Sequence, residues 1–332
     1  MRKLLLSSTA IATAAILSTN AAIADVSISA ASEWTYVNRA SDQTTLDGDS
    51  YGAESEIAFK FSNKTDSGLD IAYEVQLETD DTDTAINESF ITISGGFGKL
   101  VLGGNDAVGD NYGIEVEDLI AEEGGQAGAA YSVASSSILT DTDIINAISD
   151  ANKVSYHIPA MGGFTAGVSL TDSGDAEATD TTSYGAQYAM TVGGAAVTVG
   201  GAIQSTQVES AEDTDSQNLG VKVVNGNLSV ALATADWETA DDDVSSKGIS
   251  ASYNFGNGYT VGAWSMISED DLEVGEEYTA AGVEVQYTIA AGLTAVLNVT
   301  DYEYTAATTP NSDGTAVTDS GTGTKLVIKA SF

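Results

Sequence analysis

The feature that most constrains the fold of this chain is a regular alternation of apolar with polar or small residues, repeated in short segments along most of its length. In one such segment Leu69, Ile71 and Val75 share one face, and Asp70 and Glu74 share the other. Because successive side chains of a β-strand point to opposite faces, this period of two predicts strands. We expect sixteen strands, near residues 26–38, 50–62, 68–79, 86–95, 98–104, 152–159, 163–171, 183–192, 195–205, 216–224, 227–237, 246–255, 258–268, 277–289, 292–303 and 323–332.

The predicted connections switch regularly between short and long. The short ones are 63–67, 96–97, 160–162, 193–194, 225–226, 256–257 and 290–291, and the long ones are 39–49, 80–85, 105–151, 172–182, 206–215, 238–245, 269–276 and 304–322. A soluble antiparallel sandwich also alternates, so alternation alone does not decide the fold. An even number of strands, with tight turns at one end and long loops at the other, is typical of a bacterial outer-membrane barrel.

Strands that cross a membrane must close into a barrel, because an unpaired backbone amide in hydrocarbon costs several kcal/mol. The first and last strands should therefore pair. The last strand sorts its side chains to its final residue, with Leu326, Ile328, Ala330 and Phe332 on one face and Lys325, Lys329 and Ser331 on the other. The sequence thus predicts an all-β fold, a sixteen-stranded antiparallel transmembrane β-barrel.

Aromatic residues gather near both ends of the predicted strands. Near the short turns lie Phe59, Phe61, Phe97, Phe164, Phe255, Tyr259, Tyr287 and Phe332, and near the long loops lie Tyr36, Tyr51, Tyr184, Trp237, Tyr278 and Tyr302. Membrane barrels carry aromatic girdles at both membrane–water boundaries. We therefore expect these two sets to form two girdles.

The N-terminus has the pattern of a secretory signal over residues 1–24. Arg2 and Lys3 precede an apolar run, and residues 22–24 (Ala-Ile-Ala) fit a cleavage site with small residues. A membrane anchor would need about 20 apolar residues, and this run is shorter and interrupted by Ser and Thr. We expect an exported protein with one mature domain, residues 25–332.

The chain is strongly acidic, with 49 Asp and Glu against 11 Lys and Arg and a formal net charge of -38. Nucleic-acid binding requires a basic surface, so this composition argues against it. Highly charged chains of low hydrophobicity stay unfolded, but 42% of these residues are hydrophobic and many alternate, so disorder is expected only in loops. Without Cys, the chain has neither disulfides nor thiolate metal sites.

The longest predicted connection, residues 105–152, is rich in acids and contains no Lys or Arg. A structureless connection of that length is uncommon in a compact protein and is usually functional. We predict that it folds inside the barrel and narrows the pore, with a short amphipathic helix over residues 141–151. Its candidate constriction acids are Asp106, Asp110, Glu115, Glu117, Asp118, Glu122 and Glu123. The alternative is that these charges only keep an exposed loop soluble.

The early strands supply candidate residues for the wall of the pore: Glu54, Glu56, Lys60, Asp70 and Glu74. Carboxylates lining a narrow pore favour cations. Two unit charges about 4 Å apart interact by roughly 4 kcal/mol at an effective dielectric near 20, and physiological salt screens beyond about 8 Å. Acids close to a permeating ion, and not those of the outer loops, should therefore set a preference for cations.

Three stretches resemble the general diffusion porins of Gram-negative bacteria, and the resemblance extends over the mature chain. Residues 96–104 resemble the fifth-strand motif before the third loop, 118–125 the tip of that loop, and 153–164 the hairpin after it. The resemblance implies a sixteen-stranded homotrimer in outer-membrane lipid, whose third loop folds inward and places acids opposite a basic wall. By position, Asp118 and Glu122 carry the acidic role. The terminal Phe332 resembles the signature that the barrel-assembly machinery recognises.

The chain also departs from the family pattern. Gly104 stands where members often have Arg, Ala121 stands where the tip commonly has Pro, and Glu123 stands where it has Phe. The early strands carry acids where the family places arginines, and Lys60 is the best candidate for an inward cation. We therefore expect an acidic lumen of one sign rather than a lumen divided between two signs.

Two further interpretations stay open beside a passive channel for small polar solutes and ions. The chain could be a secreted acidic β-protein, a surface layer or adhesin stabilised by calcium, since residues 80–83, 241–243 and 269–271 cluster oxygen ligands. It could also be a channel with a dedicated site for phosphate or sugar, although neither a basic ladder nor stacked lumen aromatics is evident. His157 is the only His, and no catalytic or cofactor motif is present, so we expect neither an enzyme nor a cofactor.

Overall fold

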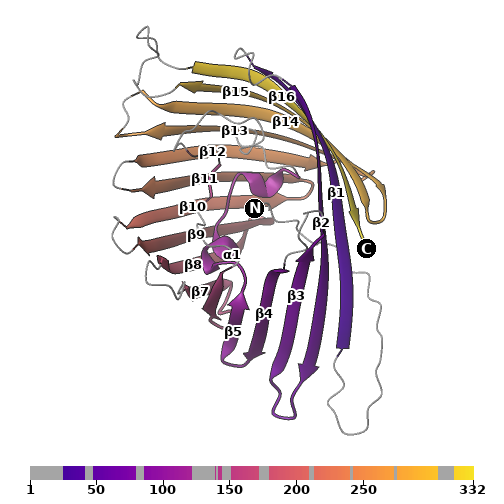
Figure 1. The fold of residues 1–332 in the computed structure, drawn as a ribbon, viewed down its shortest axis with the longest axis vertical. Helices are drawn as coiled ribbons and strands as arrows, with labels where there is room; N and C mark the ends of the chain where they lie inside the picture. The colour runs from indigo at the N-terminus through magenta and orange to yellow at the C-terminus, as the bar shows by residue number, and fades with distance from the viewer. Residues whose placement is uncertain are drawn as a thin grey trace.

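The computed structural model of the chain is a single closed barrel of sixteen antiparallel strands (Figure 1). It describes residues 25–41, 48–79, 86–121, 139, 141–143, 151–171, 179–208, 213–239, 242–272, 275–305 and 318–332. The strands are β1 Asp25–Ser41, β2 Gly48–Lys64, β3 Asp70–Glu78, β4 Ile86–Gly95, β5 Gly98–Gly104, β6 Asn152–His157, β7 Phe164–Thr171, β8 Thr179–Val192, β9 Ala195–Val208, β10 Thr214–Asn225, β11 Leu228–Glu238, β12 Asp243–Asn254, β13 Tyr259–Asp270, β14 Glu277–Ala290, β15 Leu293–Thr305 and β16 Thr318–Ser331.

The sixteen predicted strands are confirmed, and β4 and β5 have the predicted bounds. Several strands extend further at the long-loop end: β8 begins at Thr179 instead of 183, and β16 at Thr318 instead of 323. These extensions are made of Thr, Asp, Ser and Gly, which show no apolar alternation yet pair with neighbouring strands.

Two short helices inside the longest connection were not predicted: α1 Val108–Tyr112 and the 3-10 turn η1 Glu117–Leu119. The helix expected over 141–151 lies mostly outside the described residues. Within the described part of the chain, no helix is long and apolar enough to span a membrane.

The barrel closes where β1 pairs with β16, over Ala31–Ser41 and Ser331–Gly321. Ala30 and Phe332 exchange backbone hydrogen bonds of 3.1 and 2.8 Å. Trp34 lies opposite Ile328 across this seam, so the apolar face of the last strand is continuous with that of the first.

At the long-loop end of the seam a buried ion pair joins the two strands from inside. Arg39 on β1 donates to the carboxylate of Asp319 on β16. The Nε of Arg39 also donates to the Tyr302 hydroxyl at 2.8 Å, and the guanidinium lies 5.2 Å from the centre of that ring. Ser41 donates to Asp319 at 2.5 Å.

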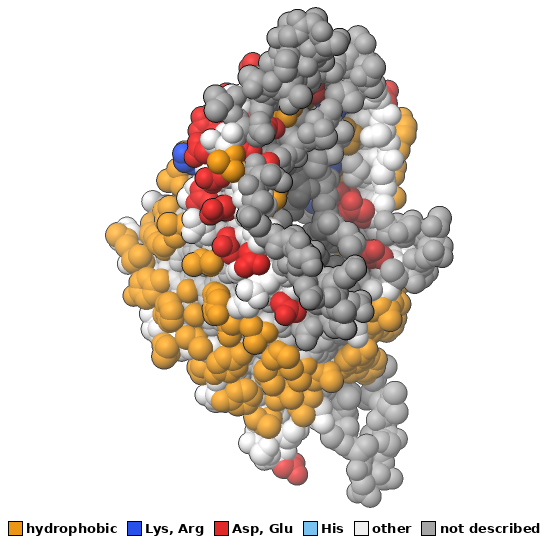
Figure 2. All heavy atoms as spheres, turned by 60° about the vertical axis from the view of Figure 1, so that its left-hand side comes forward, with side chains coloured by type: hydrophobic (Ala, Val, Ile, Leu, Met, Phe, Trp, Pro, Cys, Tyr) orange, Lys and Arg blue, Asp and Glu red, His pale blue; other side chains and the backbone are white. Residues whose placement is uncertain are grey.

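Alternation sorts side chains to the two sides of the wall, as predicted. On the face shown in Figure 2, apolar side chains form a broad band, and acidic side chains gather above it. On outward positions of β9, β10 and β12, Ile203, Leu219 and Ile249 are 58%, 59% and 48% exposed. Such apolar exposure suits a surface covered by lipid.

The girdle prediction is confirmed at the short-turn end, where Phe97, Phe255 and Phe332 are exposed on the outer surface. At the long-loop end it is only partly right. Tyr51 and Tyr184 are exposed, but Tyr278 and Tyr302 are almost completely buried inside the barrel.

The inward aromatics share an apolar cluster with the end of the described loop. Its members are Ile120, Leu139, Ala235, Val244, Trp264, Met266, Tyr278, Ala280, Tyr302 and Tyr304, with Val37 and Trp237 packed against them. Trp237 and the two tyrosines were assigned to the girdle by their distance from a loop, whereas their parity along the strand places them inside.

Removing the seam cation should destabilise the barrel strongly. In Arg39→Met, Asp319 keeps its buried charge without its partner, which typically costs about 3–5 kcal/mol. Denaturant unfolding of the detergent-refolded protein measures this loss. Lys64→Met is the matched control, since the Lys64–Asp70 pair is exposed and such pairs contribute about 0–1 kcal/mol. Equal losses in the two variants would contradict the role given to the seam pair.

Candidate functional site

The segment after β5 turns into the barrel and runs along its inner wall (Figure 1). Its first helix, α1, packs on β7, β8 and β9. The backbone N–H of Val108 donates to the Ser169 hydroxyl at 3.0 Å, and that of Gly109 donates to the Ser183 hydroxyl at 2.8 Å. Hydroxyls of the wall thus satisfy amides that the first turn of a helix leaves without partners.

Glycines on the inner face of the wall let the loop lie against it. A Cβ at Gly185 would come within 2.8 Å of Tyr112, one at Gly220 within 2.3 Å of the Ile114 carbonyl oxygen, and one at Gly262 within 2.8 Å of Ile120. We call the inward glycines beneath the loop the glycine track: Gly167, Gly185, Gly200, Gly220, Gly248 and Gly262. Any larger residue here would push the loop towards the centre of the pore.

One side chain of the wall binds both limbs of the loop. Asn218 on β10 accepts from the Ile114 N–H and donates to the Ile114 carbonyl, both at 3.2 Å. Its amide also donates to the carbonyl of Thr142 at 2.5 Å. Because Asn218 is buried, these bonds fix the separation between the outgoing limb at Ile114 and the returning limb at Thr142.

The two limbs are also joined to each other around a buried carboxyl group. The Thr142 hydroxyl accepts from the Val116 N–H at 3.1 Å and donates to Glu117 at 2.9 Å. Burial, and then the nearby Asp141, raise the pKa of Glu117 to about 8. Burial, and then Asp143, raise the pKa of Glu115 well above its usual value. Both groups therefore hold a proton at pH values where an exposed Glu is ionised.

The structure places the predicted constriction acids in different environments. Asp106 and Asp110 are half-buried at the start of the loop, Glu115 is half-buried, and Glu117 is buried. Asp118 forms an ion pair with Lys222 of β10 at 3.1 Å. Glu122 and Glu123 lie outside the described residues. Asp118 is the most accessible of the five described acids, but it faces a lysine on the same wall.

The five wall candidates all lie on the inner face of β2 and β3. They alternate with Phe61 and Tyr73, which are exposed outside the barrel. Lys60 pairs with Glu74 at 3.2 Å. Glu54 lies opposite Glu33 of β1, and Glu56 opposite Glu78 of β3. The inner wall therefore has neighbouring carboxylates directly across from each other.

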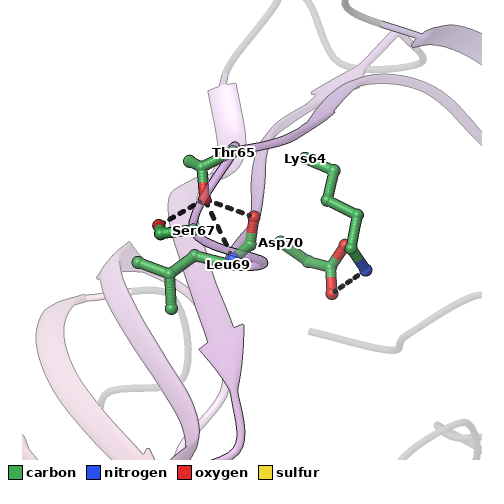
Figure 3. Close-up of polar contacts among 5 residues, drawn as sticks. All are labelled: Lys64, Thr65, Ser67, Leu69 and Asp70. Carbon is green, nitrogen blue, oxygen red and sulfur yellow. Dashed lines mark hydrogen bonds and ion pairs between the residues drawn. The ribbon is translucent and has the colours of Figure 1, made fainter.

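The hairpin between β2 and β3 carries the remaining wall candidate at the short-turn mouth (Figure 3). The Thr65 hydroxyl accepts from the Leu69 N–H at 2.9 Å, and the Lys64 ammonium lies 3.0 Å from the Asp70 carboxylate. The side chains of Lys64 and Asp70 line a polar recess of about 440 Å³ that also includes Asp25 and Ser94. Asp70 is thus at the mouth of the pore and not at the constriction.

Lys60 points inward as predicted, but it is not alone, so the expectation of a lumen of essentially one sign is wrong. Cations on eight inward positions share the face that contacts the loop: Arg39, Lys60, Lys64, Lys99, Lys153, Lys222, Lys325 and Lys329. Among the described strands, Lys247 points outward. Few cations occur in the sequence, but nearly all those on strands point into the barrel.

His157, the only His, is inward and holds the loop. Its Nδ1 lies 2.8 Å from the Tyr112 hydroxyl.

The barrel interior does contain aromatic residues, but Trp264, Tyr278 and Tyr304 are at most 5% exposed and cannot stack on a passing sugar. Among the described residues no group of three or more acids or histidines is placed to hold a metal ion, and residues 80–83 and Asp241 of the suggested calcium clusters lie outside that part.

A closed barrel that is apolar outside, polar inside and narrowed by an inward loop defines a transmembrane diffusion channel. A model of the Gram-negative porin family matches residues 8–322, and the chain belongs to this family. It is therefore an outer-membrane porin, a passive channel and not an enzyme. Membership also sets aside the alternative of a secreted surface-layer protein or adhesin.

Solved porin structures share the fold at low sequence identity. A refined porin structure is 19% identical, covers 92% of this chain and 100% of its own, and gives a TM-score of 0.66. The loop L8 deletion mutant of Vibrio cholerae OmpT is 14% identical, covers 93% of this chain and 99% of its own, and gives a TM-score of 0.67. The anion-selective porin from Comamonas acidovorans is 17% identical, covers 93% of this chain and 100% of its own, and gives a TM-score of 0.64. A search of curated protein sequences gave no significant match.

The raised pKa of Glu117 predicts that the packing of the loop weakens as pH rises. The folded state holds more protons than the unfolded state between about 4.5 and about 8, so stability falls with pH across this window. Amide exchange of loop peptides, corrected for intrinsic rates, should show less protection at pH 9 than at pH 5. Glu117→Gln, which stays neutral, should reduce this dependence and leave the share that belongs to Glu115. The same loss of protection in the variant would disprove the assignment to Glu117.

Proposed function

We propose that this porin carries small hydrophilic solutes and ions and prefers cations. The observation that carries the proposal is the register of the inner wall, which places Glu54 opposite Glu33 and Glu56 opposite Glu78. Of these four, Glu33 forms an ion pair with Lys329. Like charges directly opposite on one face of a sheet repel each other. A cation passing along this wall relieves that repulsion, whereas an anion meets the same field unfavourably.

The loop acids contribute less than their number suggests. Glu117 holds a proton near neutral pH because its pKa is raised to about 8, and burial also raises the pKa of Glu115. The charge of Asp118 is offset by Lys222. We therefore assign the larger part of the selectivity to the acids on the inner wall of β1–β3. The loop acids Asp106, Asp110, Asp118, Glu122 and Glu123 contribute a smaller part.

Charge must be argued from this chain, because the fold alone does not decide the sign. The structural relative from Comamonas acidovorans is an anion-selective porin. In the present chain the inward lysines Lys60, Lys222 and Lys329 each lie beside a carboxylate. Pairs of this kind cancel at a distance, and on the inner faces of β1–β3 the carboxylates outnumber the cations Arg39, Lys60 and Lys64, so this excess of acid sets the sign.

Assembly and export are part of the same proposal. A form of Vibrio cholerae OmpT is a trimer, and we propose a homotrimer for this chain as well. Residues 1–24 would direct export. The exposed ring of Phe332, at the end of the closing strand, would be the signature that the barrel-assembly machinery reads.

Reversal potentials in a salt gradient across a planar lipid bilayer test the selectivity. The wild-type channel should pass cations preferentially, and Glu54→Gln/Glu56→Gln/Glu78→Gln should shift the reversal potential towards zero. The matched control is Glu269→Gln/Glu277→Gln/Glu303→Gln, which removes the same formal charge from exposed outward positions. Screening beyond about 8 Å predicts that the control stays close to wild type. Anion preference in the wild type, or equal shifts in both variants, would contradict the proposal.

A further inference from the structure

Ala121, the last described residue before the gap at 122–138, is held by β14 and β16 and is linked through β16 to β1 across the barrel seam. Its N–H donates to Glu284 on β14 at 2.8 Å, and its carbonyl accepts from the Lys329 ammonium on β16 at 2.8 Å. Lys329 in turn forms an ion pair with Glu33 on β1 at 3.3 Å. We call Glu33, Ala121, Glu284 and Lys329 the tip clamp.

We propose that the tip clamp sets how far the loop reaches across the pore, and that Lys329 is both its positioning residue and a determinant of ion selectivity. The inference rests on the proposed channel function and deepens it. The position of the loop should affect conductance and open-channel noise, and the charge of Lys329 should affect the reversal potential.

The strength of the clamp follows from the groups that form it. The carbonyl of Ala121 bonds to the Lys329 ammonium, and charge-assisted hydrogen bonds are roughly twice as strong as neutral ones. Glu284 and Glu33 are 4% and 6% exposed, so water competes little for them. The Lys329 side chain is about one-third exposed, so its charge is also accessible from the lumen.

The clamp follows directly on the other attachments of the outgoing limb. Asn218 holds the loop at β10, and Ile120 is buried in the apolar cluster and contacts Gly262 on β13. Beyond these points, the clamp reaches β14, β16 and β1. Release of the clamp would therefore free Ala121, while Ile120 and the limb at Asn218 stay on the wall.

The N–H of Ala121 offers a way to cut the clamp without changing any charge. Proline has no N–H to donate, so a proline at this position could not bond Glu284.

Single-channel recording with Ala121→Pro, Lys329→Met, Lys329→Arg and Glu284→Gln separates geometry from charge. Ala121→Pro should change the conductance step and increase open-channel noise, with little shift in reversal potential. Lys329→Met should do the same and also shift the reversal potential towards stronger cation preference. Glu284→Gln keeps an acceptor oxygen, so it should keep the wild-type noise while it weakens cation preference. Lys329→Arg keeps the charge and the donor, so it should keep the wild-type noise and the wild-type reversal potential.

The control is Lys247→Met, which removes one positive charge from the outer face and should leave conductance and reversal potential unchanged. Wild-type noise and conductance in both Ala121→Pro and Lys329→Met would overturn the positioning role. A reversal potential in Lys329→Met equal to that of Lys247→Met would overturn the selectivity role. If Lys329→Met fails to fold, judged by its gel mobility before boiling, Ala121→Pro and Glu284→Ala decide the positioning role. Absence of channels from the wild type would instead refute the proposed function.

Discussion

In hydrocarbon no water is present to bond a backbone amide, so every strand of this chain needs a partner on both edges. β1 and β16 meet that requirement by pairing with each other. The seam they form also carries the buried Arg39–Asp319 pair and, further along, the bond between Lys329 and the loop. Closure thus satisfies the backbone and at the same time provides the wall to which the constriction loop is fastened.

The loop can narrow the pore without collapsing into it because the wall beneath it lacks side chains at particular points. Gly185, Gly220 and Gly262 admit loop atoms to distances that a Cβ would forbid. Asn218 and the hydroxyls of Ser169 and Ser183 then satisfy backbone groups that would otherwise be buried without partners. The outer face of the same strands stays apolar for lipid, so the period of two serves both surfaces at once.

Much of the fold could be predicted from sequence because alternation and connection length are local signals. Parity also placed Lys325 and Lys329 opposite the apolar face of the last strand, which the pairing of β16 confirms. The inward folding of the loop was predicted, but the wall residues that hold it could not be, since the attachment depends on contacts between residues as distant as Ile114 and Asn218. Inward glycines such as Gly220 were the available signal. Tyr278 and Tyr302 were misplaced because nearness to a loop was given more weight than parity.

The central claim is that the loop lies against the inner wall on the glycine track, and a designed disulfide tests it most directly. A Cβ at Gly248 would lie 3.0 Å from both methyl groups of Val116. The Cβ of Val116 is one carbon–carbon bond beyond those methyl groups, so the two Cβ atoms would be at most about 4.5 Å apart, which a disulfide can span. The chain has no other Cys to interfere. Mass spectrometry of oxidised Val116→Cys/Gly248→Cys should find this cross-link in the folded barrel. Two free thiols that both react with a soluble maleimide would contradict the account.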